Sequence, residues 1–232
     1  GGAVPAVLDK LGADRARLLL YLWPPPGKET LPVEMSLADF PLLEARSVSH
    51  LALVGIAWDL GASDGIVIRG GERCIVAGCR VTRMAGTGIE VRGGTRHAIL
   101  SSDIASLGRG GIVLSGGDRK SLAPGGHLVE NCHIRELSRI DHTYTPGVLV
   151  EGVGNRVAHS LITDIPHAGI LMWGSAHTIE YNRLLRTCLE TEDAGAIGGA
   201  ISGAVRGGAT GITGGIVGCV GSVGSVGVTG GI

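Results

Sequence analysis

A repeat of roughly 22 to 26 residues runs from His50 to about Gly199, and it constrains the fold more than any single motif does. Each unit contains a glycine followed by a β-branched residue. These markers are Gly65-Ile66, Gly88-Ile89, Gly111-Ile112, Gly147-Val148, Gly169-Ile170 and a weaker Gly195-Ala196-Ile197. A unit this short holds two short strands and can bury apolar surface only against its neighbours, which is typical of a solenoid.

A second marker is an eight-residue segment that precedes the glycine. These segments are Cys74–Val81, His97–Ile104, His127–Ile134, Asn155–Ile162 and His177–Leu184. Their sixth position holds a small or amide residue, and their eighth is aliphatic. The sixth position reads Cys79, Ser102, Cys132, Ser160 and Asn182. Period-two alternation predicts that this position forms an inward-facing ladder of a parallel β-helix.

The length of the unit also limits the topology. A βαβ crossover needs about 30 residues, so these units are too short to contain one. The sequence therefore predicts an all-β protein with a single-stranded, right-handed parallel β-helix, and the handedness follows the general rule for parallel crossovers. The 41 glycines and the single phenylalanine among 232 residues also suit thin stacked sheets better than an aromatic-rich globule.

Three segments are predicted along the chain. Residues 1–46 lack the repeat and are expected to cap the exposed strand edges of the first coil. Residues 47–199 are predicted to form a β-helix of about six coils, and residues 200–232 are a Gly/Val-rich low-complexity tail. Apolar end coils left uncovered could support self-association of the protein.

Charge and cysteine content exclude several classes of ligand. The formal net charge is −1 and the charges are scattered, which argues against nucleic acid or an anionic membrane as a partner. The five cysteines include no Cys-x-x-Cys pair and no zinc signature. Cys79 and Cys132 are two coils apart, so they are expected to be core thiols rather than a disulfide. No metal and no cofactor are expected.

Loop length predicts where the functional site lies. Six residues separate the end of the first strand from the glycine marker in coils two, three and five. The same interval holds twelve residues in coil four, from Arg135 to Pro146, and ten in coil six, from Leu185 to Ala194. Both insertions are expected at one corner of the solenoid, and loops on a rigid scaffold are where sites are usually built.

Titratable and aromatic residues gather in these corner loops. The candidates are Asp141, His142 and Tyr144 in coil four, Asp164 and His167 in coil five, and Glu190, Glu192 and Asp193 in coil six, with Arg109 lower at the same corner. Stacked coils are about 5 Å apart, so groups remote in sequence can converge on one ligand. A carboxylate pair can cleave a glycosidic bond by acid–base or nucleophilic catalysis.

We therefore predict Asp193 and Asp164 as the catalytic pair and Glu190 as a third catalytic candidate. His167, His142, Tyr144, Glu192 and Arg109 are predicted to bind the sugar. The competing interpretation is that acidic residues at coil corners are solvated turn residues with no chemical role.

Several motifs together resemble a known family. They include Tyr144-Thr145-Pro146, Asp164-Ile165-Pro166-His167 and the stretch from Glu190 to Ala196. Over about residues 15 to 197 the chain is similar to bacterial right-handed β-helix repeat proteins and most similar to glycoside hydrolase family 141, which includes fucosidase and xylanase activities. The resemblance implies an exported enzyme, secreted or periplasmic, that acts on a polysaccharide or oligosaccharide.

Alternatives to a hydrolase remain open. A polysaccharide lyase uses the same scaffold, and it would need a basic residue and often calcium. A truncated, non-catalytic carbohydrate-binding or structural solenoid is a second alternative. A metal site made by His142, His167 and Asp164 is a weaker third.

Overall fold

In a computed structural model of the protein, residues 26–27, 32–191 and 195–201 are described. The chain divides into two units, Gly1–Leu37 and Ala38–Ile232. The described residues of the first unit contain no helix and no strand, whereas those of the second form twenty β-strands. Within the described residues, no helix is long and apolar enough to cross a membrane.

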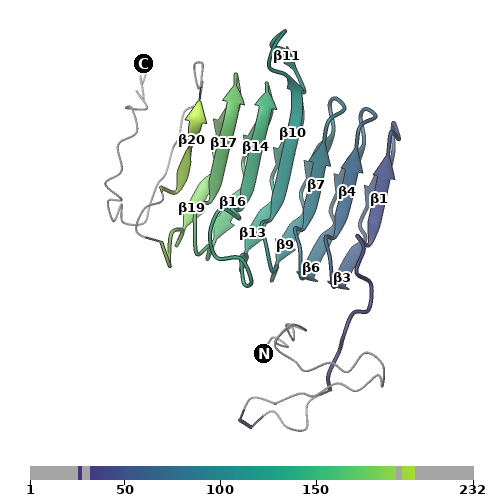
Figure 1. The fold of residues 1–232 in the computed structure, drawn as a ribbon, viewed down its shortest axis with the longest axis vertical. Coiled ribbons are helices and arrows are strands. Elements are labelled where there is room, and N and C mark those ends of the chain that lie inside the picture. Colours follow the sequence, from purple (N-terminus) through teal and green to yellow (C-terminus); the bar gives the residue numbers. More distant parts are fainter. Residues whose placement is uncertain (1–25, 28–31, 192–194, 202–232) are drawn as a thin grey trace. The chain divides into compact units, whose positions relative to one another are not determined.

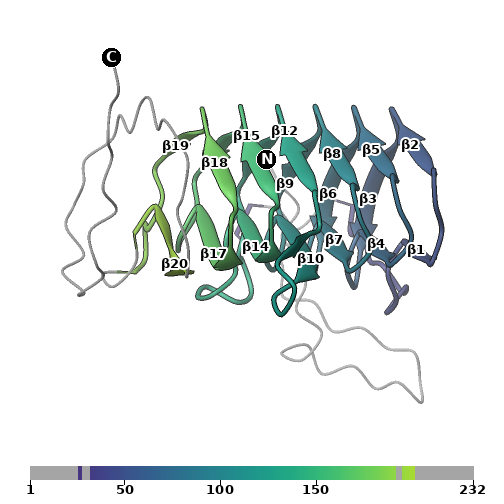
Figure 2. The same cartoon turned by 90° about the horizontal axis from the view of Figure 1, so that it is seen from above.

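The strands form three sheets, and six successive coils each contribute one strand to each sheet, while a seventh strand extends the longest sheet (Figure 1 and Figure 2). The long sheet contains, in order, β1 (Leu43–Arg46), β4 (Ile66–Arg69), β7 (Ile89–Arg92), β10 (Ile112–Asp118), β14 (Val148–Val153), β17 (Ile170–Ser175) and β20 (Ile197–Ile201). A short strand, β11 (Ala123–Pro124), pairs antiparallel with the end of β10.

The other two sheets consist of shorter parallel strands. The second sheet contains β2 (Ala52–Val54), β5 (Ile75–Ala77), β8 (Ala98–Leu100), β12 (Leu128–Glu130), β15 (Arg156–Ala158) and β18 (Thr178–Glu180). The third contains β3 (Ala57–Gly61), β6 (Arg80–Met84), β9 (Asp103–Ala105), β13 (His133–Arg135), β16 (Leu161–Thr163) and β19 (Arg183–Leu185). Seen from above, the second sheet and the long sheet lie on different sides of the coils (Figure 2).

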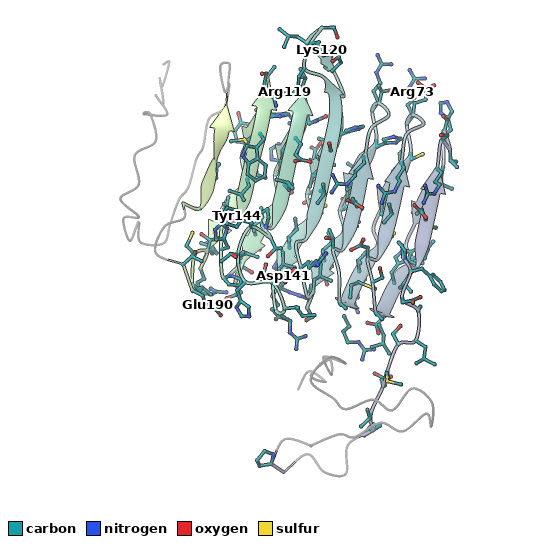
Figure 3. The ribbon with its side chains drawn as sticks, viewed as in Figure 1. Arg73, Arg119, Lys120, Asp141, Tyr144 and Glu190 are labelled. Atoms are coloured by element: carbon teal, nitrogen blue, oxygen red, sulfur yellow. The ribbon has the colours of Figure 1, made fainter. Side chains whose placement is uncertain are left out.

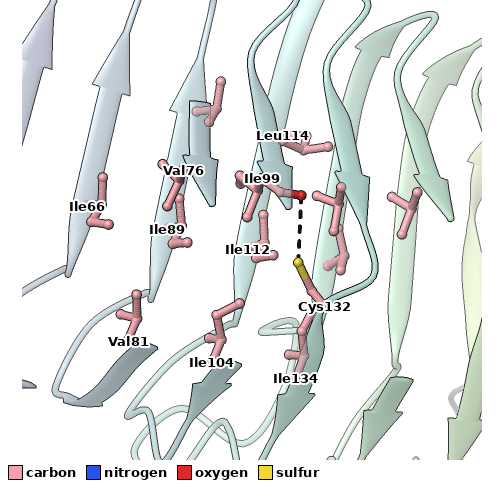
Figure 4. Close-up of a cluster of buried hydrophobic side chains, with 14 of the residues drawn as sticks. Ile66, Val76, Val81, Ile89, Ile99, Ile104, Ile112, Leu114, Cys132 and Ile134 are labelled. Carbon is pink, nitrogen blue, oxygen red and sulfur yellow. Dashed lines mark hydrogen bonds between the residues drawn. The ribbon is translucent and has the colours of Figure 1, made fainter. Parts of the chain in front are cut away.

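The core is a set of stacked aliphatic columns inside the coils. Ile66, Ile89 and Ile112 occupy equivalent positions of neighbouring strands, and each is almost completely buried. Figure 4 shows this column together with the equivalent residues Val81, Ile104 and Ile134 of the third sheet. Because consecutive strand residues point to opposite faces, the period-two pattern of the sequence places one aliphatic column inside each wall. The predicted parallel β-helix is therefore confirmed.

The predicted sixth-position ladder is also confirmed. The Cys79 N–H donates to Ser102 Oγ at 3.2 Å, and the Cys132 N–H donates to Ser160 Oγ at the same distance. The Ser160 N–H in turn donates to Asn182 Oδ1 at 2.9 Å. Each side chain therefore accepts a backbone hydrogen bond from the preceding coil, which satisfies a donor that would otherwise be buried without a partner.

A second ladder runs through the first position of the same segments and contains three histidines. The His97 N–H donates to His127 Nδ1 at 3.2 Å, and the His127 N–H donates to Asn155 Oδ1 at 3.0 Å. The Asn155 N–H donates to His177 Nδ1 at 3.2 Å. Since Nδ1 is the acceptor, these rings are neutral and carry their proton on Nε2.

The cysteines of the core behave as small apolar residues. Cys74, Cys79 and Cys132 are buried free thiols, and Cys188 is partly exposed. The Cys132 thiol donates to the Ile99 carbonyl at 3.7 Å (Figure 4). Burial raises the pKa of the Cys132 thiol to about 11, so it remains protonated and unreactive at neutral pH.

The solenoid begins earlier than the predicted boundary at residue 47. β1 pairs in parallel with β4 and has Leu43 in register with Ile66, so it is the first strand of the long sheet and not part of a cap. The repeat was missed there because Leu42 stands where later coils carry the marker glycine. At the other boundary β20 continues to Ile201, and residues 202–232 of the predicted tail lie outside the described residues.

Candidate functional site

The long loops meet at one corner, as their lengths predict. Residues 136–147, 164–169 and 186–196 each connect the third sheet to the long sheet in coils four, five and six. The Cys188 N–H donates to the His167 carbonyl at 2.8 Å, and the Glu190 N–H donates to the Pro166 carbonyl at 3.0 Å. These backbone bonds hold the loop of coil six on the loop of coil five.

An imidazole–carboxylate pair joins coils four and six across coil five. His142 Nδ1 lies 2.5 Å from Glu190 Oε2, and the two side chains are 52% and 54% exposed. Figure 3 shows Glu190 and Tyr144 on this side of the molecule, with Asp141 in the same group of loops. The pair is accessible to a ligand and can exchange a proton with it.

Two rings lie beside one another between coils four and five. The ring centroids of Tyr144 and His167 are 5.4 Å apart, and the rings are tilted by 42°. Tyr144 is 74% exposed, whereas His167 is buried and has no hydrogen-bond partner for Nδ1 among the described residues. Desolvation lowers the pKa of His167, so its ring is neutral at physiological pH.

Asp164 is held by a cation from the next coil. Arg186 Nε and Nη2 donate to its two carboxylate oxygens at 2.6 and 2.7 Å. This hydrogen bonding, aided by the positive charge, lowers the pKa of Asp164 below its usual range. An ionised carboxylate held in this way can act as a base or nucleophile or can fix the loops, but it has no proton to give as a general acid.

The remaining predicted residues divide into two groups. Arg109 Nε lies 2.8 Å from Asp141 Oδ2, which links coil three to the long loop of coil four. Glu192 and Asp193 lie outside the described residues, so the predicted pairing of Asp193 with Asp164 is not tested. Among the described residues, no three histidine, cysteine, aspartate or glutamate side chains are grouped so that they could hold a metal ion.

A second concave region was not predicted from the sequence. A trough of about 650 Å³ lies at the C-terminal end of the long-sheet strands, beside the β10–β11 hairpin. It is lined by Thr95, Ser115, Asp118, Arg119, Glu151 and Trp173, with several glycines. One sequence signal could have indicated this region, namely the spacing between equivalent ladder residues. His127 follows His97 by 30 residues, whereas His97 follows Cys74 by 23. The longer interval contains the β10–β11 hairpin beside the trough.

The comparisons with known proteins agree with the parallel β-helix. Residues 63–184 match a family described as a right handed beta helix region. This match covers more than half of the 232 residues, so the chain belongs to the right-handed β-helix family.

One solved structure shares this fold. Tailspike protein 2 of the Escherichia coli O157:H7 bacteriophage CAB120 aligns with a TM-score of 0.53 and 12% identity. The alignment covers 68% of this chain and 21% of the tailspike chain, so this chain spans about a fifth of the tailspike's length. No curated protein sequence matches the chain. The finer resemblance to glycoside hydrolase family 141 stays a prediction.

Proposed function

We propose that this protein binds a polysaccharide or oligosaccharide at the corner formed by the long loops and hydrolyses a glycosidic bond there. One observation carries the proposal: the exposed His142–Glu190 pair brings together two loops that are longer than their neighbours. Loops that exceed the minimum needed to close a coil, and that present titratable groups to solvent, favour a binding or catalytic role.

The corner offers groups for each task of glycoside hydrolysis. The reaction needs a general acid and a second carboxylate that acts as base or nucleophile. We assign Glu190 to the second role, because its neighbour His142 can take up or return a proton. We assign the acid role to Asp193 on sequence grounds, since it follows Glu190 by three residues in the same loop.

The surrounding residues are suited to hold a sugar. Tyr144 presents an exposed ring against which a sugar ring can pack. The Arg109–Asp141 and Arg186–Asp164 pairs fix the neighbouring loops and offer hydrogen-bonding groups at the edge of the site. An exported location, secreted or periplasmic, is part of this proposal because polysaccharides are met mainly outside the cytoplasm.

The test is a product screen of the full chain on plant and bacterial glycans. We expect new reducing ends, and we expect Glu190→Gln and Asp193→Asn each to lower the rate at least about 100-fold, since each removes a proton-transfer group. Glu72→Gln is the matched control, because Glu72 is an exposed carboxylate on another part of the coil. An ultraviolet-absorbing product without hydrolysis would indicate a lyase instead.

Non-catalytic carbohydrate binding is the second candidate, and a specific observation favours it. Three described carboxylates of the corner each face a basic group: Asp141 faces Arg109, Asp164 faces Arg186, and Glu190 faces His142. A binding protein can use such paired charges without proton transfer. Retarded migration in a glycan-containing gel, with no product from any substrate, would select this candidate over hydrolysis.

A further inference from the structure

The β10–β11 hairpin creates a site that is separate from the corner. It extends past the ends of the neighbouring strands, with Arg119 and Lys120 at its tip (Figure 3). The trough beside it lies at the C-terminal ends of the long-sheet strands, whereas the corner loops lead into the N-terminal ends of β14, β17 and β20. Its volume of about 650 Å³ falls within the roughly 300–1,000 Å³ typical of small-molecule sites.

We propose that this trough binds a carboxylated sugar unit of an acidic polysaccharide, with Arg119 receiving the carboxylate, Trp173 contacting the sugar ring and Glu151 accepting hydroxyl hydrogen bonds. The inference rests on the proposed function only in taking carbohydrate as the ligand. It requires no cleavage and no residue of the corner.

The inner wall of the trough is a row of outward-facing residues in register. Ser115 lies opposite Glu151, and Glu151 lies opposite Trp173, on the adjacent strands β10, β14 and β17. Neighbouring strands are about 4.8 Å apart, so a hydroxyl, a carboxylate and an indole follow one another over about 10 Å. An aromatic face next to polar acceptors matches the apolar ring face and the equatorial hydroxyls of a sugar.

The next residues along the strands are glycines, which leave the floor of the trough free of side chains. Gly116 and Gly152 are opposite each other in register. A Cβ at Gly116 would lie 2.1 Å from His127 Nε2, and a Cβ at Gly152 would lie at the same distance from the Gly116 carbonyl oxygen. These positions therefore require glycine, because a side chain would meet the buried ring of His127 or the neighbouring backbone, and both residues line the trough with backbone atoms alone.

The hairpin turn leaves Arg119 available. Asp118 Oδ1 accepts the Lys120 N–H at 2.9 Å and Oδ2 accepts the Ser121 hydroxyl at 2.7 Å, so this carboxylate is used within the turn. The hydrogen bond from Ser121, followed by the one from Lys120, lowers the pKa of Asp118. No described carboxylate forms an ion pair with Arg119, which lines the trough.

Arg119 is the cation of the trough that is left for an anionic group. Arg92 Nη1 lies 3.6 Å from Glu151 Oε2, and Arg92 also contacts the Glu90 carboxylate, so these three side chains are already paired with one another. The Asp118 carboxylate is used within the turn, so the Arg119 guanidinium has no described carboxylate partner. The planar guanidinium of Arg119 matches a planar carboxylate in a two-point hydrogen bond, which favours a uronate over a neutral sugar.

The test is calorimetric titration of the full chain with trigalacturonate as the probe. We expect saturable binding that weakens at least about tenfold in Arg119→Gln and in Trp173→Ala. Lys120→Gln is the matched control, because it removes the adjacent positive charge of the same turn without touching the trough lining, and it should change affinity less than about twofold. The methyl ester of the probe should bind at least about tenfold more weakly.

The outcomes separate this site from the corner. Glu190→Gln should bind the probe as the unmodified chain does, whether or not any glycan is hydrolysed. Absence of probe binding to the unmodified chain would overturn the proposal. Equal losses in Arg119→Gln and Lys120→Gln, or equal affinity for the methyl ester, would do so too, because either would show that no specific carboxylate contact exists.

Discussion

At the scale of single residues, the histidine ladder is the most informative feature. His97 and His127 stack with ring centroids 5.1 Å apart, and both are buried. Each Nδ1 accepts a backbone hydrogen bond from the coil before it. Protonation of Nδ1 would put two donors face to face inside the solenoid, so the ladder requires neutral rings.

This requirement predicts acid sensitivity. Desolvation, followed by repulsion from His97, lowers the pKa of His127 to about 4 from its ordinary value of about 6.5. Because the unfolded chain binds the proton more readily, His127 contributes its full stability above pH 6.5 and loses it as the pH falls from 6.5 to 4. The loss amounts to about 3 kcal/mol.

Urea unfolding between pH 7 and pH 4 measures this effect. His127→Asn is the matched variant, because Asn155 shows that an amide oxygen serves as acceptor in the same ladder. The free energy of unfolding of the variant should fall less over this range than that of the unmodified chain, by about the same 3 kcal/mol. Parallel pH curves for the two proteins would show that His127 does not sense acid.

At the scale of elements, loop length was readable from the sequence and side-chain pairing was not. The counts between repeat markers predicted the corner, because every coil must close with the same minimal connection. Arg186, the partner of Asp164, could not be predicted. Both residues adopt a left-handed backbone, with φ of 58° for Asp164 and 49° for Arg186, and this geometry sets where each side chain points. The trough was missed because Ser115, Glu151 and Trp173 come from three coils and share no motif.

The hairpin depends on one glycine. Gly117 has a φ of 89°, and a Cβ there would lie 2.6 Å from the Val153 carbonyl oxygen. Gly117→Ala should therefore destabilise the protein by roughly 2–4 kcal/mol through backbone strain and overpacking together. Gly93→Ala provides the control, because Gly93 also has a positive φ of 68° but its Cβ would meet nothing closer than 4.0 Å. Thermal unfolding of both variants should show the smaller loss of stability, about 1 kcal/mol, for Gly93→Ala. Equal losses of stability in the two variants would show that the hairpin tolerates a side chain at Gly117.

At the scale of the whole molecule, the β-helix is a stack of equivalent coils in which each coil contacts its neighbours. The repeat predicted this architecture because register, period and inward columns all repeat with it. It did not reveal the first coil, where Leu43 pairs with Ile66 without a preceding marker glycine.

Stacking of this kind makes coil deletion a sharp test. Removal of residues 66–88 takes out one complete turn, including β4, and lets β1 pair directly with β7, because both strands pair with β4 in the same frame in the intact protein. The shortened protein should fold and show a smaller denaturant dependence of unfolding, because less surface is buried. Removal of residues 66–76 alone shifts the inward columns and should abolish cooperative unfolding. If both deletions unfold alike, the coils are not interchangeable units.

The two polar ladders also have a direction. Both start at a cysteine, Cys74 or Cys79, whose backbone donates to the coil after it. A new coil added before these residues needs a backbone N–H at each ladder position, which every residue except proline supplies. A coil added behind His177 or Asn182 must itself bring an acceptor side chain. Lengthening of such a protein by gene duplication is thus constrained at its C-terminal side to units that carry histidine, asparagine, serine or, as at Cys132, cysteine at these two positions.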